Sequence, residues 1–182
     1  MLAFVLITLL VACALSAASQ QLSSRDKAQE IAALFNKHKS AVKEKYGVSK
    51  EKYKDVRSEP VVKQNLTDYS GVYEVPELGY VISIQVEPDG RIQASGYEIG
   101  AESNQRSRVF KLEQATIVGG LLTASKVYDN GTAEKFEGVF MNRTARTSPT
   151  DSGVTTFGLG VVLGTPLERD SLTYEKLFYQ RQ

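Results

Sequence analysis

The chain has 182 residues, about enough for one domain, and its 24% charged and 42% apolar residues are the mix of an ordinary soluble globular protein. Its formal net charge of +1 gives the whole molecule no electrostatic basis for binding nucleic acid. The single histidine (His38) and single cysteine (Cys13) exclude a zinc site built from several such side chains, and we expect neither a metal nor another cofactor.

The first 18 residues carry no charge, and residues 2–10 form a nearly continuous apolar run. This run is shorter than the roughly 20 residues that a membrane-spanning helix needs, and small residues follow it. We therefore interpret residues 1–18 as a signal peptide. A buried N-terminal helix or strand is the alternative.

Residues 10–13, Leu-Val-Ala-Cys, resemble the bacterial lipobox, in which cleavage leaves the cysteine as a lipidated first residue. The resemblance implies a lipid anchor at Cys13 that attaches the protein to a membrane, as in a periplasmic or outer-membrane-associated lipoprotein. Cleavage near residues 16–18 is the alternative, and it would release a secreted protein. In both cases the mature domain has no disulfide, because there is no second cysteine.

Residues 19–60 are predicted to form a basic helical segment. Between Ser24 and Arg57, apolar residues recur at the 3.6-residue period of one helix face, and Gly47 is a natural end for the first helix. Ser49 is placed to begin a second, short helix that carries Tyr53 and Val56. Residues 21–60 hold ten Lys or Arg against six Asp or Glu, which indicates either a solvated helix face or attraction to an anionic envelope surface.

Residues 61–182 are predicted to form an antiparallel β domain, because the apolar period changes from 3.6 to 2 beyond Asp68. Turn sequences at 87–90 and 129–131 join strands into hairpins, and the adjacent glycines 119 and 120 indicate a bulge or tight turn. The expected strands are 71–75, 80–86, 91–95, 108–112, 121–128, 132–141, 154–163 and 172–181.

About eight short strands in sequence order favour a mainly β fold, an up-and-down barrel preceded by the helical segment. A two-sheet sandwich is the alternative. Residues 157–164 mix large side chains with glycine, as a curved barrel wall requires, and the polar stretch 142–153 is expected to be a mobile loop.

Ser70-Gly71-Val72-Tyr73-Glu74, an alternating strand with an Asp-Gly turn, and the final Leu-Phe-Tyr-Gln-Arg strand resemble the lipocalin-like (calycin-type) β domains of bacterial envelope proteins. They also resemble the β domain appended to some penicillin-binding-protein-like serine hydrolases. The resemblance covers about residues 69–140. It implies a binding or scaffolding module without catalytic residues of its own.

Aromatic residues at expected inward positions are the candidate ligand-binding residues, with plain core packing as the alternative: Tyr73, Tyr80, Phe110, Phe136, Phe140, Phe157, Tyr174 and Phe178. The leading hypothesis is a membrane-tethered, non-enzymatic envelope protein whose β domain binds an apolar small ligand or an envelope protein.

One alternative is a hydrolase that uses strand carboxylates, namely Glu74, Glu87, Glu98, Glu113, Glu134 and Glu137. Another is a structural or inhibitory envelope protein with an exposed apolar patch. An internal cavity of about 300 Å³ or more would favour ligand binding, and a filled interior would favour a protein partner.

Overall fold

The computed structural model describes residues 23–36, 55–75, 80–98, 108–146, 148, 150, 152–162 and 175–180. The predicted signal peptide with Cys13, as well as His38 and Tyr174, lie outside the described residues. Within the described ranges, no helix combines the length and apolar character needed to cross a bilayer.

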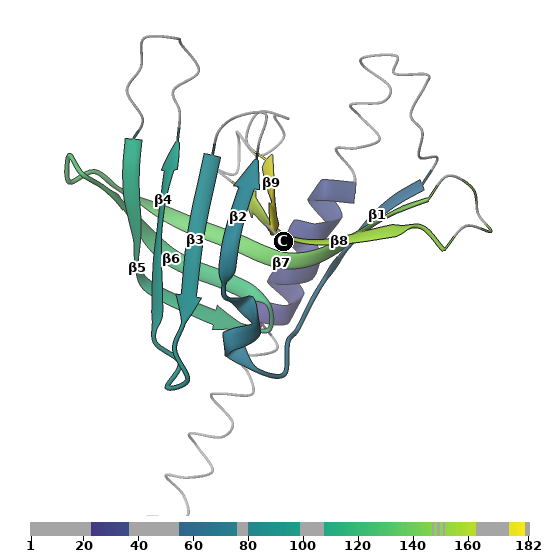
Figure 1. The fold of residues 1–182 in the computed structure, drawn as a ribbon, viewed down its shortest axis with the longest axis horizontal. Helices are drawn as coiled ribbons and strands as arrows, with labels where there is room; N and C mark the ends of the chain where they lie inside the picture. The colour runs from purple at the N-terminus through teal and green to yellow at the C-terminus, as the bar shows by residue number, and fades with distance from the viewer. Residues whose placement is uncertain are drawn as a thin grey trace, which may run out of the picture.

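One antiparallel sheet forms most of the molecule, and a helix of residues 23–36 precedes it (Figure 1). The elements of the β domain are β1 (Asp55–Pro60), the 3₁₀ helix η1 (Leu66–Tyr69), β2 (Gly71–Val75), β3 (Tyr80–Val86), β4 (Ile92–Glu98), β5 (Arg108–Val118), β6 (Leu121–Tyr128), β7 (Ala133–Arg146), β8 (Val154–Val162) and β9 (Glu175–Gln180).

The strands β2 to β9 form a ring in sequence order. Each pairs antiparallel with the next, and β9 returns to pair with β2 through Tyr73↔Gln180 and Glu74↔Tyr179. The predicted mainly β class and eight-stranded up-and-down arrangement are therefore confirmed, and the sandwich alternative is not observed. The ninth strand, β1, pairs with the C-terminal half of β7.

Most strands lie where the alternating pattern placed them. The bounds of β2, β3 and β6 agree with the expected ranges, and Gly119 and Gly120 form the tight turn between β5 and β6. Both glycines have positive φ, 61° and 83°, which a two-residue hairpin turn requires and other residues rarely adopt. In β5 the register shifts between Glu113 and Thr116 at a bulge.

Two local expectations were wrong. Residues 55–57, expected at the end of the second short helix, belong to β1, because their backbone pairs with β7 over the whole length of the strand. Residues 142–146, expected to begin a mobile loop, continue β7, where β1 on one edge and β8 on the other hold them. The backbone hydrogen bonds of both segments come from pairing with strands far away in the sequence, and local sequence preferences do not indicate such pairing.

Apolar side chains are buried on both sides of the barrel wall. The inner cluster takes the inward residues of the strands, among them Ile82, Leu112, Phe140 and Leu159. The outer cluster lies between the helix and the wall, where Ala28, Ile31 and Ala32 pack on Leu121, Val139 and Met141. The predicted apolar stripe of the helix is thus confirmed at Ile31, and the helix covers the outside of the barrel.

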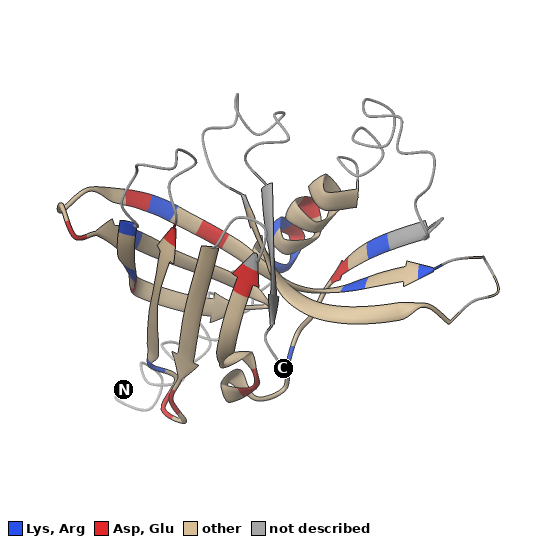
Figure 2. Ribbon diagram, turned by 45° about the horizontal axis from the view of Figure 1, so that its top comes forward, with Lys and Arg blue, Asp and Glu red and all other residues tan. Residues whose placement is uncertain are grey.

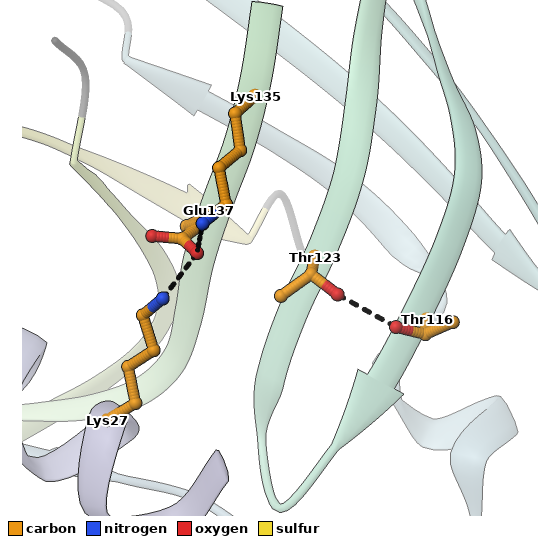
Figure 3. A network of polar contacts seen from close by, with 5 residues as sticks. All are labelled: Lys27, Thr116, Thr123, Lys135 and Glu137. Carbon is orange, nitrogen blue, oxygen red and sulfur yellow. Dashed lines mark hydrogen bonds and ion pairs between the residues drawn. The ribbon is translucent and has the colours of Figure 1, made fainter. Parts of the chain in front are cut away.

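Two polar contacts fix the helix in place. The Lys27 ammonium donates to Glu137 on the outer side of β7 at 2.5 Å, and Lys135 binds the same carboxylate at 2.7 Å (Figure 3). At the other end of the helix, Asn36 receives a hydrogen bond from the Ser58 N–H (2.8 Å) and donates one to the Ser58 carbonyl (3.0 Å). Burial opposes ionisation of Glu137, but the hydrogen bonds from the two lysines outweigh it and lower its pKa.

Glycine in β8 permits the close approach of the helix. A Cβ atom on Gly160 would lie 2.5 Å from the Met141 side chain and 2.9 Å from the Phe35 ring. The alternation of large and small residues in 157–161 therefore has a direct cause: Leu159 and Val161 fill the interior, and Gly160 faces the helix.

Candidate functional site

The predicted aromatic residues divide between the two ends of the barrel. At the end covered by η1, Tyr73, Phe140 and Phe157 form a cluster with Tyr69, which belongs to η1. Tyr69 lies 4.4 Å from Phe140, and the stacked rings of Phe140 and Phe157 lie 6.0 Å apart, between centroids. These distances are those of close-packed aromatic pairs.

Hydrogen bonds close this end. The Tyr73 hydroxyl donates to the Tyr69 carbonyl at 2.7 Å, and the Lys63 N–H donates to the Tyr69 hydroxyl at 2.7 Å. Burial raises the pKa of both tyrosines and keeps their hydroxyls protonated, and the Tyr69 hydroxyl in turn donates to the Val61 carbonyl at 3.2 Å. The arrangement is that of a structural plug.

The opposite end of the barrel holds a buried ion pair. Lys126 points inward from β6 with only 3% of its side chain exposed, and it binds Glu98 at the end of β4, which is 18% exposed. The ammonium also lies 4.5 Å from the centre of the Phe110 ring and 4.7 Å from that of Tyr128. The pair is thus embedded in aromatic side chains, where charge is costly unless it is compensated.

Further contacts order the side chains around this pair. The Tyr128 hydroxyl donates to the second oxygen of Glu98 at 3.3 Å, and the Arg108 guanidinium lies 3.8 Å from the centre of the Tyr128 ring. Burial, and then the charge of Glu98, raise the pKa of Tyr80 and of Tyr128. We call Tyr80, Glu98, Arg108, Lys126 and Tyr128 the rim cluster.

The cavity beside the rim cluster is small. Its lining includes Tyr80, Phe110 and Phe136 together with Lys126, and its volume is about 10 Å³. One water molecule needs about this much space, whereas small-molecule pockets begin near roughly 300 Å³. The described residues therefore leave no ligand-sized cavity next to Lys126.

A larger hollow lies on the outer face of the same end. Its volume is about 420 Å³. We call it the outer hollow, and it is lined by Val109, Phe110, Lys111, Glu113, Val127, Tyr128 and Asp129. Val109 is 49% exposed, and Tyr97, its directly opposed neighbour on β4, is 41% exposed. Figure 2 shows both charge signs on the strands around this end.

The remaining predicted residues and carboxylates are placed as follows. Phe178 belongs to β9, and its side chain, like Tyr174, lies outside the described residues. Glu98 and Glu137, from the hydrolase alternative, are each bound to lysine. The described residues contain no group of three His, Cys, Asp or Glu side chains that could hold a metal ion.

Two members of the rim cluster were predicted separately, Tyr80 as a ligand-binding residue and Glu98 as a carboxylate of the hydrolase alternative. Lys126, which binds Glu98, was not predicted, although the sequence carries a signal for it. In Leu121–Tyr128 the inward positions are 122, 124, 126 and 128, so alternation places a lysine inside the barrel. A charged residue at an inward position is the kind of exception that marks a specific interaction.

No family model, curated protein or solved structure matches this chain.

Proposed function

We propose that this chain is an exported, non-enzymatic binding protein, held at a membrane by a lipid on Cys13, whose barrel recognises an envelope protein through the outer hollow. The observation that carries the proposal is the contrast between the 420 Å³ hollow outside the wall and the 10 Å³ cavity inside it. The volume that could receive a partner's side chain is on the outer face.

Exposed apolar area supports this choice. Tyr97 and Val109 face each other across β4 and β5 on the outer face, and Val127 lines the hollow from β6. The core of a protein interface is typically apolar with a polar rim, and Lys111, Glu113 and Asp129 supply polar side chains around these residues. The expected occupant is an apolar side chain of the partner, with polar groups on either side of it.

The rim cluster has a supporting role in this proposal. The Lys126–Glu98 pair joins β6 to the end of β4 across β5, and Arg108 at the start of β5 stacks on Tyr128. Because these contacts fix three strand ends relative to one another, they hold the outer hollow in one shape. A surface that is already shaped before binding loses less conformational entropy when the partner arrives.

Site-specific photo-crosslinking in the cells that make the protein tests the proposal. A benzophenone amino acid at Val109 should give one discrete adduct with an envelope protein, and Val127→Lys in the same chain should abolish it. The matched control places the photo-crosslinker at Val62, which is 53% exposed between β1 and η1. Equal labelling from both positions, or none from Val109, would rule out the outer hollow.

An apolar small ligand remains a second candidate, favoured by the buried charge among the aromatic rings of Tyr80, Phe110 and Phe136. Such a ligand would have to displace side chains, because the present cavity is about 10 Å³. Val161→Ile adds one carbon atom to the cavity lining. Saturable fluorescence enhancement of 1-aminoanthracene that becomes weaker in this variant would support the interior ligand. Saturable enhancement that is unchanged in Val161→Ile, as expected for a probe bound at the outer hollow, would remove it.

A further inference from the structure

Parts of β1, β7 and β8 extend beyond the barrel as a wing (Figure 1). The wing consists of β1, the C-terminal half of β7 and the beginning of β8, with β7 in the middle. Arg57, Thr144 and Thr155 stand directly opposite one another across the three strands, so they share one face. The hydroxyls of Thr144 and Thr155 are hydrogen-bonded at 2.9 Å.

The edge of the wing formed by β1 is protected. Asn36 pairs with both the N–H and the carbonyl of Ser58, and therefore occupies the position of a neighbouring strand. The same edge carries Arg57, Glu59 and Pro60. Charged residues and proline are the usual means by which proteins prevent an edge strand from pairing with another chain.

Within the part of the chain that the structure describes, the edge formed by residues 154–157 of β8 carries no such protection. Its residues 154–157 are Val-Thr-Thr-Phe, which are uncharged and favour extended structure, and Figure 2 draws this strand without a charged position. Between described residues, the pairing with β9 begins at Gly158. Among the described residues, no strand pairs with 154–157 on the side away from β7.

We propose that this edge, residues 154–157 of β8, pairs with the same edge of a second copy of the chain. Backbone N–H and C=O groups on an edge strand form a template for another strand. A twofold axis perpendicular to the sheet makes the two strands antiparallel and keeps each face of the wing continuous. The result is a six-stranded sheet with two β8 strands at its centre.

The register follows from the sequence of the edge. An axis at Thr155 pairs Thr155 with its own copy and Val154 with Thr156 of the second copy. An axis at Thr156 would bring Val154 opposite Gly158, whose position is already taken by β9. The axis at Thr155 is therefore the better fit.

The paired side chains are compatible with self-association. Thr155 already bonds to Thr144 on its own wing, so pairing extends a row of threonine hydroxyls across the axis. Threonine pairs on one face are favourable cross-strand neighbours, and this register places no like charges directly opposite each other. These features favour a second copy over an unrelated strand.

Disulfide trapping tests the proposed register. In a Cys13→Ala background, Thr155→Cys should form a disulfide-linked dimer under mild oxidation, since directly opposed strand residues have Cα atoms within disulfide range. A mixture of Val154→Cys and Thr156→Cys chains should yield mainly the mixed dimer. The matched control is Thr116→Cys. Thr116 forms a similar exposed threonine pair, with Thr123 at 2.8 Å, but both residues lie on the paired strands β5 and β6 and not on an open edge (Figure 3).

Sedimentation velocity provides a second readout. The unmodified chain should sediment as a dimer, Thr155→Ser should remain one, and Thr155→Lys should be monomeric with an unchanged circular dichroism spectrum. A monomeric unmodified chain, equal trapping at Thr116, or trapping of a different protein at Thr155 would overturn the proposal. Each outcome is independent of the outer hollow, which lies on β5 and β6.

Discussion

Replacing Lys126 with methionine should destabilise the barrel strongly. Methionine preserves most of the length of the side chain but removes the charge that compensates Glu98, leaving the carboxylate with the Tyr128 hydroxyl at 3.3 Å. Breaking a buried ion pair on one side costs about 3–5 kcal/mol. Because Glu98 remains 18% exposed, water relieves part of this cost, and we expect about 3 kcal/mol.

Urea unfolding at pH 7, followed by circular dichroism, measures this loss. With a denaturant dependence of about 2 kcal/mol per molar urea, the unfolding midpoint should fall by about 1.5 M. The slope should not change, because the substitution leaves the surface exposed on unfolding nearly constant.

Two further variants separate the buried pair from simple loss of packing. Adding Glu98→Gln to Lys126→Met removes the uncompensated charge and should recover most of the stability, to within about 1 kcal/mol of the unmodified chain. Lys135→Met removes a lysine that is 71% exposed and should cost less than about 1 kcal/mol. If Lys126→Met costs no more than Lys135→Met, or if Glu98→Gln recovers nothing, the assignment of a buried compensating charge is wrong.

Three substitutions test the docking of the helix on the barrel. The pKa of Glu137 is lower in the folded chain than the ordinary value of 4.5, so its contribution to stability is complete above that value and is lost as the pH falls through the folded pKa. The free energy of unfolding, measured from pH 6 to pH 3, should therefore decrease less steeply in Glu137→Gln than in the unmodified chain. Gly160→Ala should lower the free energy of unfolding by about 1–3 kcal/mol, because the added Cβ meets the Phe35 ring of the helix. The weakened docking should appear as faster amide hydrogen exchange in residues 23–36. Unchanged exchange would contradict the close approach of the helix to β8. Asn36→Ala should cost about 1–3 kcal/mol in urea unfolding because the buried Ser58 backbone loses both partners, whereas a neutral result would show that water replaces them.

The barrel could be predicted because period-two alternation and turn chemistry are local signals. Ile82 and Ile84 alternate with exposed residues in β3, and Gly119-Gly120 marks a turn that needs positive φ. The wing could not be predicted in the same way. Residues 55–57 continue a helical pattern, and only their pairing with residues 144–146 of β7 makes them β.

The sequence pattern tells which side chains face the interior of the barrel and which face outward, but it does not tell how either set is packed. Inward aromatic residues such as Tyr73 and Phe140 were foreseen, but whether they pack together or surround a cavity depends on distances that alternation does not contain. Val139 and Met141 occupy outward positions in β7, a pattern that indicates a covered outer face; the helix provides that cover. Lys126 combines an inward position with a charge, and its partner Glu98 is 28 residues away.

Chemical-shift mapping by NMR tests most directly whether the working surface lies outside the barrel. Titrating the methyl-labelled chain with 1-aminoanthracene, a small apolar probe, should shift the methyl signals of Val109 and Val127 at the outer hollow. The inner methyl groups of Ile82 and Val161, which line the cavity beside Lys126, should keep their positions. Saturable shifts of Ile82 and Val161 with Val109 unchanged would contradict the account and move the binding site into the interior.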